Sequence, residues 1–339
     1  MAIFLNIFFK TFAIVLSVIL TILILISILS FIDSSNNNEY SLISGDENSS
    51  NTIVVLELNG MIINSNDQFS KLVNPFVISP LAVKNQLQDL ENISPKILIF
   101  SINSPGGTVS ASKNLYDIIK KFKKNNNVDI FFHTNELLAS GGYWVSSSGD
   151  KIYANYGAVV GSIGVRGPDW FFYDNPKSIS TGFLGNTVET KNGIKVYTST
   201  AGKSKDIFNP FREPTLEETN QLQNMVDEIY DDFVRVVSKE RKIEINTIKS
   251  SIGALIYTSN KSKKLHLIDD EISLDNLIQK TISENNYKSY KVLKNNNNNS
   301  LIKDIVMGQL YNKDINLKIE CLSLRSSISA ILSYQSTGC

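Results

Sequence analysis

The chain has 339 residues, of which 42% are hydrophobic and 19% are charged. This composition is ordinary for a globular protein and leaves room for one large domain or two small ones. The formal net charge at pH 7 is zero, so nothing in the composition argues for a nucleic-acid partner. The two cysteines, Cys321 and Cys339, lie near the C-terminus and form neither a disulfide framework nor a metal site.

An uncharged run rich in Ile, Leu and Val extends over residues 11–32 and is long enough to cross a bilayer as a helix. Lys10 and the free amine precede the run, and acidic residues follow it. The positive-inside rule therefore places the N-terminus in the cytoplasm and the rest of the chain outside. The alternative is a cleaved signal peptide, although the run is long for one and no Ala-x-Ala site follows it. Residues 33–51 are rich in Ser, Asn, Asp and Glu, which predicts a flexible tether.

Apolar runs and helical patterns alternate after the tether. Short apolar runs predict strands over residues 53–58, 96–102, 128–132, 151–154, 158–165 and 193–197. Apolar residues at helical spacing predict helices from Pro80, over residues 111–124, from Thr215, near 244–251 and near 259–265. Thr215 and Glu218 carry the signature of a capping box. The succession of strands and helices favours an α/β fold with parallel pairing and right-handed crossovers.

Residues 137–142 read Leu-Leu-Ala-Ser-Gly-Gly and lie between an apolar run and a predicted short helix. A serine at such a junction can expose its hydroxyl where the next backbone N–H faces a developing negative charge. The same pattern is typical of an N-cap serine beside glycines that ease a turn, so the stretch alone leaves both interpretations open. His133 lies nearby in sequence, but we interpret it as a residue at the end of a buried strand.

Three glycine-containing turns follow three predicted strands, at residues 104–107, 140–142 and 161–164. Together with the Lys-Asp-Ile segment at 205–207, their order and spacing closely resemble the signal peptide peptidase A family. That family consists of membrane-anchored serine-lysine proteases related in fold to the Clp protease subunit. The resemblance covers roughly residues 53–270, and the N-terminal anchor matches too.

The resemblance implies an α/β fold of the Clp protease and crotonase type, which is a spiral of β-β-α units behind a transmembrane helix. It implies a protease domain over residues 52–285, followed by an Asn-rich linker and appendage over residues 286–339. It places the nucleophile at Ser140, the general base at Lys205 and the hydroxyl that orients the lysine at Ser162. The oxyanion hole falls on the backbone N–H groups of Gly106 and Gly141, with Gly107 as neighbour.

The chemistry of this set is consistent with the residue types. A serine hydroxyl is a poor nucleophile and needs a base within hydrogen-bond reach. A lysine serves as that base only in its neutral form, which apolar surroundings favour. Two departures from the family pattern stand out: extra residues around 183–193, and Thr200 where the family has a lysine. Lys203 is therefore a rival candidate for the base.

The function that the resemblance implies is a membrane-anchored serine endopeptidase that cleaves hydrophobic peptides such as released signal peptides. It implies no cofactor and no metal, and a homo-oligomer in which adjacent subunits complete each active site. The alternatives are a related membrane protease that cuts a specific partner such as a stomatin-like protein, and a non-catalytic scaffold on the same fold. Acyl-CoA chemistry also uses glycine N–H oxyanion holes, but it leaves the anchor and the Ser-Lys pair unexplained.

Overall fold

The computed structural model of the chain describes residues 2–34, 40–64, 77–180 and 187–295. The chain divides into two compact units, one formed by Met1–Gly161 with Ile256–Cys339 and the other by Ser162–Leu255. The appendage predicted beyond residue 295 lies outside the described residues.

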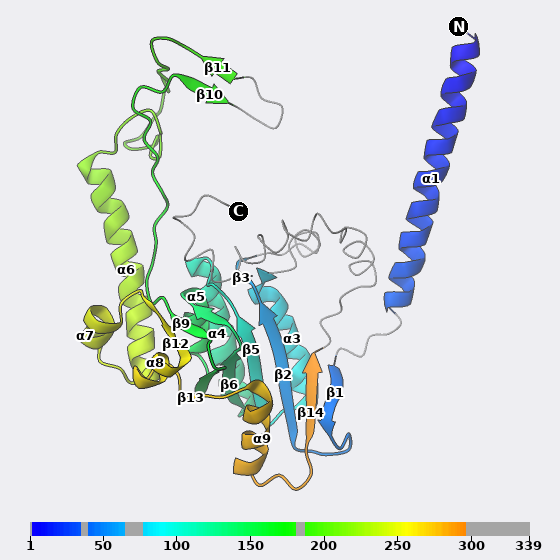
Figure 1. Cartoon of the computed structure of the whole chain (residues 1–339), viewed down its shortest axis with the longest axis vertical. Coiled ribbons are helices and arrows are strands. Elements are labelled where there is room, and N and C mark those ends of the chain that lie inside the picture. The colour runs from blue at the N-terminus through cyan, green and yellow to red at the C-terminus, as the bar shows by residue number, and fades with distance from the viewer. Residues whose placement is uncertain (1, 35–39, 65–76, 181–186, 296–339) are drawn as a thin grey trace. The chain divides into compact units, whose positions relative to one another are not determined.

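The main sheet of the first unit has seven strands in the order β1-β14-β2-β5-β6-β8-β13 (Figure 1). Their bounds are β1 Tyr40–Gly45, β14 Lys291–Asn295, β2 Thr52–Asn59, β5 Ile97–Asn103, β6 Asp129–Thr134, β8 Lys151–Ala154 and β13 Asp270–Glu271. Every neighbouring pair is parallel except β1 with β14. The predicted α/β fold with a parallel sheet is therefore confirmed.

Helices of the first unit connect and cover these strands. They are α3 Pro80–Ile93, α4 Val109–Asn126, α5 Gly141–Ser146, α8 Ser259–Lys264 and α9 Leu274–Glu284. Leu277, Ile278 and Ile282 of α9 pack against one face of the sheet. Residues of β2 and β5 that point to the opposite face are buried as well, so both faces are covered, as is usual for parallel sheets.

Two smaller sheets stand beside the main one. The three-stranded sheet has the order β12-β9-β7, with β12 Ile256–Thr258, β9 Val159–Gly161 and β7 Leu137–Ala139. A further pair consists of β3 Met61–Ile62 and β4 Val77–Ile78. Because β7 and β9 are parallel and pair Ala139 with Gly161, both strands end at the same edge. The turns that follow them carry Ser140 and Ser162.

The second unit contains the long helix α6 Leu216–Arg241, the short helix α7 Ile245–Thr247 and a π-helical turn η1 Ile248–Ile252. The predicted capping box is confirmed, because the side chain of Thr215 accepts from the Glu218 N–H and the Glu218 side chain accepts from the Thr215 N–H. The strands β10 Ser178–Ser180 and β11 Thr187–Glu189 form an antiparallel pair.

Three expectations about local structure need correction. Residues 193–197 are not a strand, and among the described residues the Ile194 N–H donates to the Pro176 carbonyl rather than to a neighbouring strand. The strand predicted over 158–165 ends at Gly161, because Ser162 adopts a left-handed backbone with φ of +56°. The sheet also takes in β1 and β14, which fall within the predicted tether and appendage.

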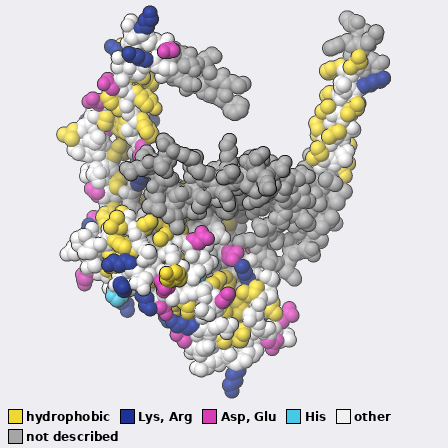
Figure 2. Space-filling view, viewed as in Figure 1, with side chains coloured by type: hydrophobic (Ala, Val, Ile, Leu, Met, Phe, Trp, Pro, Cys, Tyr) yellow, Lys and Arg dark blue, Asp and Glu magenta, His cyan; other side chains and the backbone are white. Residues whose placement is uncertain are grey.

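The N-terminal segment forms helix α1, Ala2–Ser34. Its side chains are described at residues 7–22 and 24, and all of these are exposed and mostly hydrophobic (Figure 2). Within the part of the chain that the structure describes, no helix is both long and apolar enough to cross a membrane.

Candidate active site

Ser140 lies in the tight turn between β7 and α5, with φ of +53° and ψ of −124°. A non-glycine residue with positive φ is costly, and such strain concentrates at functional sites. A serine held on a strained strand-to-helix turn has its hydroxyl presented outward. The turn is fixed by a hydrogen bond of 3.0 Å from the Ser140 N–H to the carbonyl of Gly161 on β9.

The Ser140 hydroxyl does not cap helix α5. The N-cap residues Thr108 and Thr215, in contrast, have extended backbones, and their side chains accept hydrogen bonds from Ala111 and Glu218. Ser140 therefore stands at the N-cap position of α5, and its carbonyl accepts from the Trp144 N–H, but its hydroxyl does not make the capping hydrogen bond. Its oxygen has no hydrogen-bond partner among the described residues and is available for chemistry.

The turn over residues 104–107 packs directly against the Ser140 turn. Gly106 has φ of +103°, and a Cβ there would lie 2.8 Å from the Gly141 nitrogen and 2.8 Å from the Ser140 Cβ. Only glycine permits both that backbone and that approach. Ser104 ties the two turns together, since its N–H donates to the Leu137 carbonyl and its carbonyl accepts from the Ala139 N–H.

The N–H of Gly106 is occupied within its own turn. It donates to the Ser104 Oγ at 3.1 Å, and that hydroxyl donates in turn to the Gly60 carbonyl at 2.7 Å. The same turn holds Gly107, whose nitrogen would lie 3.2 Å from a Cβ on Gly141. In the described part of the chain, no acceptor is recorded for the N–H of Gly107 or of Gly141. The signal that could have separated the two glycines is Ser104, because a serine hydroxyl commonly accepts from the backbone N–H two residues further on.

Ser162 begins the second unit, directly after the Gly161 carbonyl that accepts from Ser140. Its N–H donates to the Leu255 carbonyl at 2.8 Å, and its own carbonyl accepts from Gly164. Both sites, Ser140 and Ser162, thus have positive φ on non-glycine residues at the ends of paired strands. The described contacts leave the role of the Ser162 hydroxyl open.

The two candidate lysines differ in their contacts within the second unit. Lys203 forms an exposed ion pair with Glu217 of α6. Lys205 is also exposed, and no ion pair or hydrogen bond of its side chain is recorded among the described residues. Lys205 and Ser140 belong to different units, so their pairing stays a prediction.

Arg212 organises the segment that carries Lys205. Its guanidinium binds Asp206 and Glu218, and it lies over the ring of Trp170 at 5.4 Å from the ring centre. The Arg212 hydrogen bond is the main cause that holds the pKa of Glu218 well below its usual range, with the Thr215 N–H adding to it. The same guanidinium lowers the pKa of Asp206.

His133 is fully buried on β6, and its Nε2 lies 3.0 Å from the Ile272 carbonyl. A carbonyl only accepts, so Nε2 carries the proton and donates. Burial lowers the pKa of His133, which favours the neutral ring. The interpretation of this histidine as a buried strand residue is consistent with these contacts, and its recorded bond does not involve Ser140.

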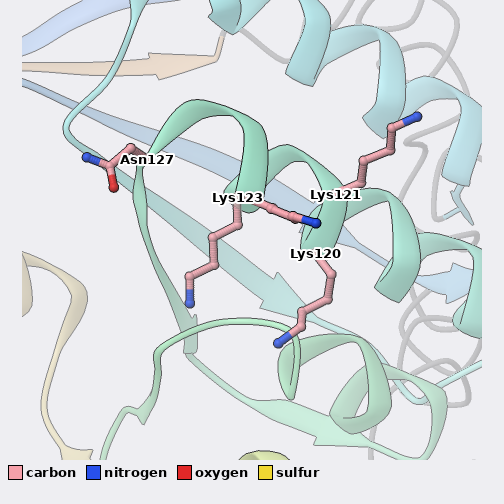
Figure 3. A pocket seen from close by; sticks show the side chains of 5 residues that line it. Lys120, Lys121, Lys123 and Asn127 are labelled. Atoms are coloured by element: carbon pink, nitrogen blue, oxygen red, sulfur yellow. The ribbon is translucent and has the colours of Figure 1, made fainter.

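A shallow hollow at the end of α4 is lined by Lys120, Lys121, Lys123, Lys124 and Asn127. Figure 3 shows the labelled lysine side chains pointing in different directions from the helix rather than toward a common centre. Lys123 also forms an ion pair with Asp150. The hollow contains none of the predicted catalytic residues, so it is a solvated basic surface and not the active site.

Comparison with known proteins finds a family model and several relatives that match part of the chain. The model of peptidase family S49 matches residues 122–288, which contain Ser140, Ser162 and Lys205. A protein of Methanocaldococcus jannaschii named as an inferred protease is 39% identical over 188 residues, 55% of each chain. A protein of Enterococcus faecium named as an inferred signal peptide peptidase is 31% identical over 241 residues, 68% of this chain and 64% of the relative.

A solved structure of a membrane-bound stomatin-specific protease aligns over 68% of this chain and 85% of the other. The identity is 13% and the TM-score is 0.40, a score too low to support any argument. The chain spans between about half and two thirds of the length of the two curated relatives above. The chain is thus similar to peptidase family S49 over residues 122–288, which include the strained serine turn.

Proposed function

We propose that the chain is a serine endopeptidase in which Ser140 is the nucleophile. The observation that carries the proposal is the Ser140 turn, where a strained backbone presents a hydroxyl that caps nothing and the glycine turn at residues 104–107 packs against it. A merely structural serine gains nothing from a positive φ, whereas a nucleophile gains exposure. The match to peptidase family S49 supports the same activity.

In the proposed reaction, the neutral amine of Lys205 removes the proton from the Ser140 Oγ as the oxygen attacks the scissile carbonyl. The Ser162 hydroxyl orients the amine. The lysine then gives the proton to the leaving amine, and the peptide bond breaks to leave an acyl ester on Ser140. Water, deprotonated by the same lysine, hydrolyses the ester and restores the serine.

We assign the oxyanion hole to the N–H groups of Gly141 and Gly107. The Gly106 N–H was the first expectation, but its bond to Ser104 leaves it unable to donate to a substrate. Gly107 belongs to the same turn and lies next to Gly141. Loss of one oxyanion donor typically costs about two to three orders of magnitude in rate.

We further propose that residues 11–32 anchor the chain in the cell membrane, with the N-terminus in the cytoplasm and the protease part outside. The uncharged run and the continuous helix α1 with exposed hydrophobic side chains support this proposal. An anchored protease meets peptides that leave the bilayer, so the substrates are hydrophobic peptides such as released signal peptides. The spiral fold of the Clp protease type and a homo-oligomeric assembly belong to the same proposal.

Labelling with a serine-reactive fluorophosphonate tests the nucleophile. The wild type should be labelled and should cleave casein, and Ser140→Ala should do neither while keeping its circular dichroism spectrum. Ser147→Ala is the matched control, because that serine is the C-cap residue of α5 and its hydroxyl donates to the Tyr143 carbonyl. Full casein cleavage by Ser140→Ala would refute the proposal and favour a non-catalytic or unrelated site.

A reporter fused after Glu47 tests the topology. An extracytoplasmic enzyme reporter, active only outside the cytoplasm, should be active in this fusion because the tether follows the anchor. A fusion with residues 2–32 deleted should lose that activity. An inactive reporter in the full fusion, with the protein present at normal amounts, would contradict the proposed orientation.

A further inference from the structure

Arg212 binds two carboxylates at the same time. Its Nε and Nη2 donate to the two oxygens of Asp206 at 2.7 and 2.9 Å. Its Nη1 and Nη2 donate to the two oxygens of Glu218 at 2.9 and 2.7 Å. This geometry uses the planar fork of the guanidinium, which lysine cannot reproduce.

Glu218 holds the Arg212 guanidinium in a fixed position. Its side chain is 3% exposed and also accepts from the Thr215 N–H at 2.9 Å, so it is held on the first turn of α6. Arg212 therefore ties Asp206 to the start of the helix. Trp170 covers the guanidinium from one side and donates its indole N–H to the Asn209 carbonyl, which limits movement of the same loop.

Asp206 directly follows Lys205 in the chain. A free carboxylate at this position would pair with the adjacent ammonium and favour the charged form of the lysine. The proposed base must be neutral to accept a proton. The Arg212 guanidinium removes this conflict, because both oxygens of Asp206 are already occupied.

Other acidic residues lie near Lys205 in this region, and their contacts are as follows. Glu217 pairs with Lys203, and Glu218 is bound by Arg212. Glu213 lies between Arg212 and the helix, and its carbonyl accepts from Arg212. The Tyr173 N–H donates to the Pro210 carbonyl, so the next residue, Asp174, also belongs to this region. No carboxylate of the described residues is recorded as a partner of Lys205.

We infer that Arg212 is a positioning residue for the general base: it withholds the Asp206 carboxylate from Lys205 and fixes the loop that carries the lysine. This inference rests on the proposed function, because it assumes that Lys205 is the base. The inference gives different roles to the two lysines of this short segment. Lys203 serves the surface pair with Glu217, and Lys205 remains available for proton transfer.

The test follows the rate of fluorophosphonate labelling of Ser140 in the full-length protein from pH 5 to pH 10. Arg212→Gln frees Asp206, so the pH of half-maximal labelling should rise by about one unit. Addition of Asp206→Asn removes the carboxylate, so the double variant should return to the wild-type midpoint even if its maximal rate stays low. Arg235→Gln is the matched control, since it breaks an exposed pair with Asp232 on α6 and should leave the profile unchanged.

A purely structural role for Arg212 predicts a lower rate at every pH with an unchanged midpoint, and that result would overturn the inference. A shifted midpoint that Asp206→Asn fails to reverse would overturn it as well. If Arg212→Gln does not fold, Asp206→Asn alone remains informative, because its midpoint should equal or fall below that of the wild type. A higher midpoint in that variant would contradict the inference. Full labelling in Lys205→Ala would instead refute the proposed base itself, so the two failures are distinguishable.

Discussion

The Ser112 Oγ fills the space that a side chain on Gly141 would need, because a Cβ at Gly141 would lie only 2.2 Å from that oxygen. Ser112 is 1% exposed, and its hydroxyl has no hydrogen-bond partner among the described residues. Helix α4 thus packs so closely behind the proposed oxyanion donor that only glycine fits. This contact therefore requires glycine at residue 141, independently of the role of its N–H as a proposed oxyanion donor.

Gly141→Ala should lose both stability and activity. Overpacking of this kind typically costs about 1–3 kcal/mol, and the movement it forces would displace the N–H of residue 141. Adding Ser112→Ala removes the closest contact and should recover part of the lost stability in a urea unfolding curve. Ser112→Ala alone should change stability little. Equal stability of Gly141→Ala with and without the second change would show that Ser112 is not the obstacle.

Ser104→Ala should lower the rate of casein cleavage although it leaves the nucleophile Ser140 unchanged. The hydroxyl donates to the carbonyl of the half-buried Gly60 and accepts from the N–H of the buried Gly106, and an unsatisfied buried polar group costs about 1–3 kcal/mol. The turn that carries Gly107 should loosen, so casein cleavage should fall more than the melting temperature alone explains. Ser146→Ala is the comparison, because its equally buried hydroxyl bonds only within α5. Similar losses in both variants would argue against a special role for Ser104.

The sequence predicts the elements whose signals are local. The capping box of Thr215 and Glu218, the parallel strands and the position of Ser140 between a strand and a helix all follow from short patterns. The φ of Ser140 does not, because it arises from the pairing of β7 with β9. The engagement of Gly106, in contrast, is local, because its N–H donates to the hydroxyl of Ser104 two residues earlier. Only the second bond of that hydroxyl, to the Gly60 carbonyl more than forty residues away, has no signal in the Ser-Pro-Gly-Gly turn.

The identity of the base can be tested by comparing two lysine variants. Lys205→Ala should be inactive, and Lys203→Ala should stay largely active because an exposed ion pair contributes little. Glu217→Gln removes the partner of Lys203 and should behave like Lys203→Ala. The measurement is the rate of casein cleavage with purified full-length protein. The reverse pattern, with Lys203 essential, would move the base to that residue.

His133 should make stability depend on pH. Burial lowers its pKa below the ordinary value of 6.5, so the unfolded chain binds a proton at pH values where the folded chain does not. The resulting stability is fully present above pH 6.5 and is lost as pH falls from there through the lowered pKa. Urea unfolding of the full-length protein at pH 5 and pH 8 measures this difference. His133→Gln should reduce the difference, and an unchanged difference would exclude His133 as its source.

Shared active sites would explain the exposed aromatic side chains of the second unit. Phe171, Tyr173 and Tyr197 are 60%, 50% and 90% exposed, which is costly in a monomer and natural at an interface. If this unit carries Lys205 to a neighbouring subunit, an oligomer of Ser140→Ala mixed with Lys205→Ala should recover part of the activity, since some sites receive one intact residue from each chain. Mixing Ser140→Ala with a Ser140→Ala/Lys205→Ala double variant is the control and should recover none. Absence of rescue in verified mixed oligomers would argue for a site within one subunit, and an active monomer would refute the shared site.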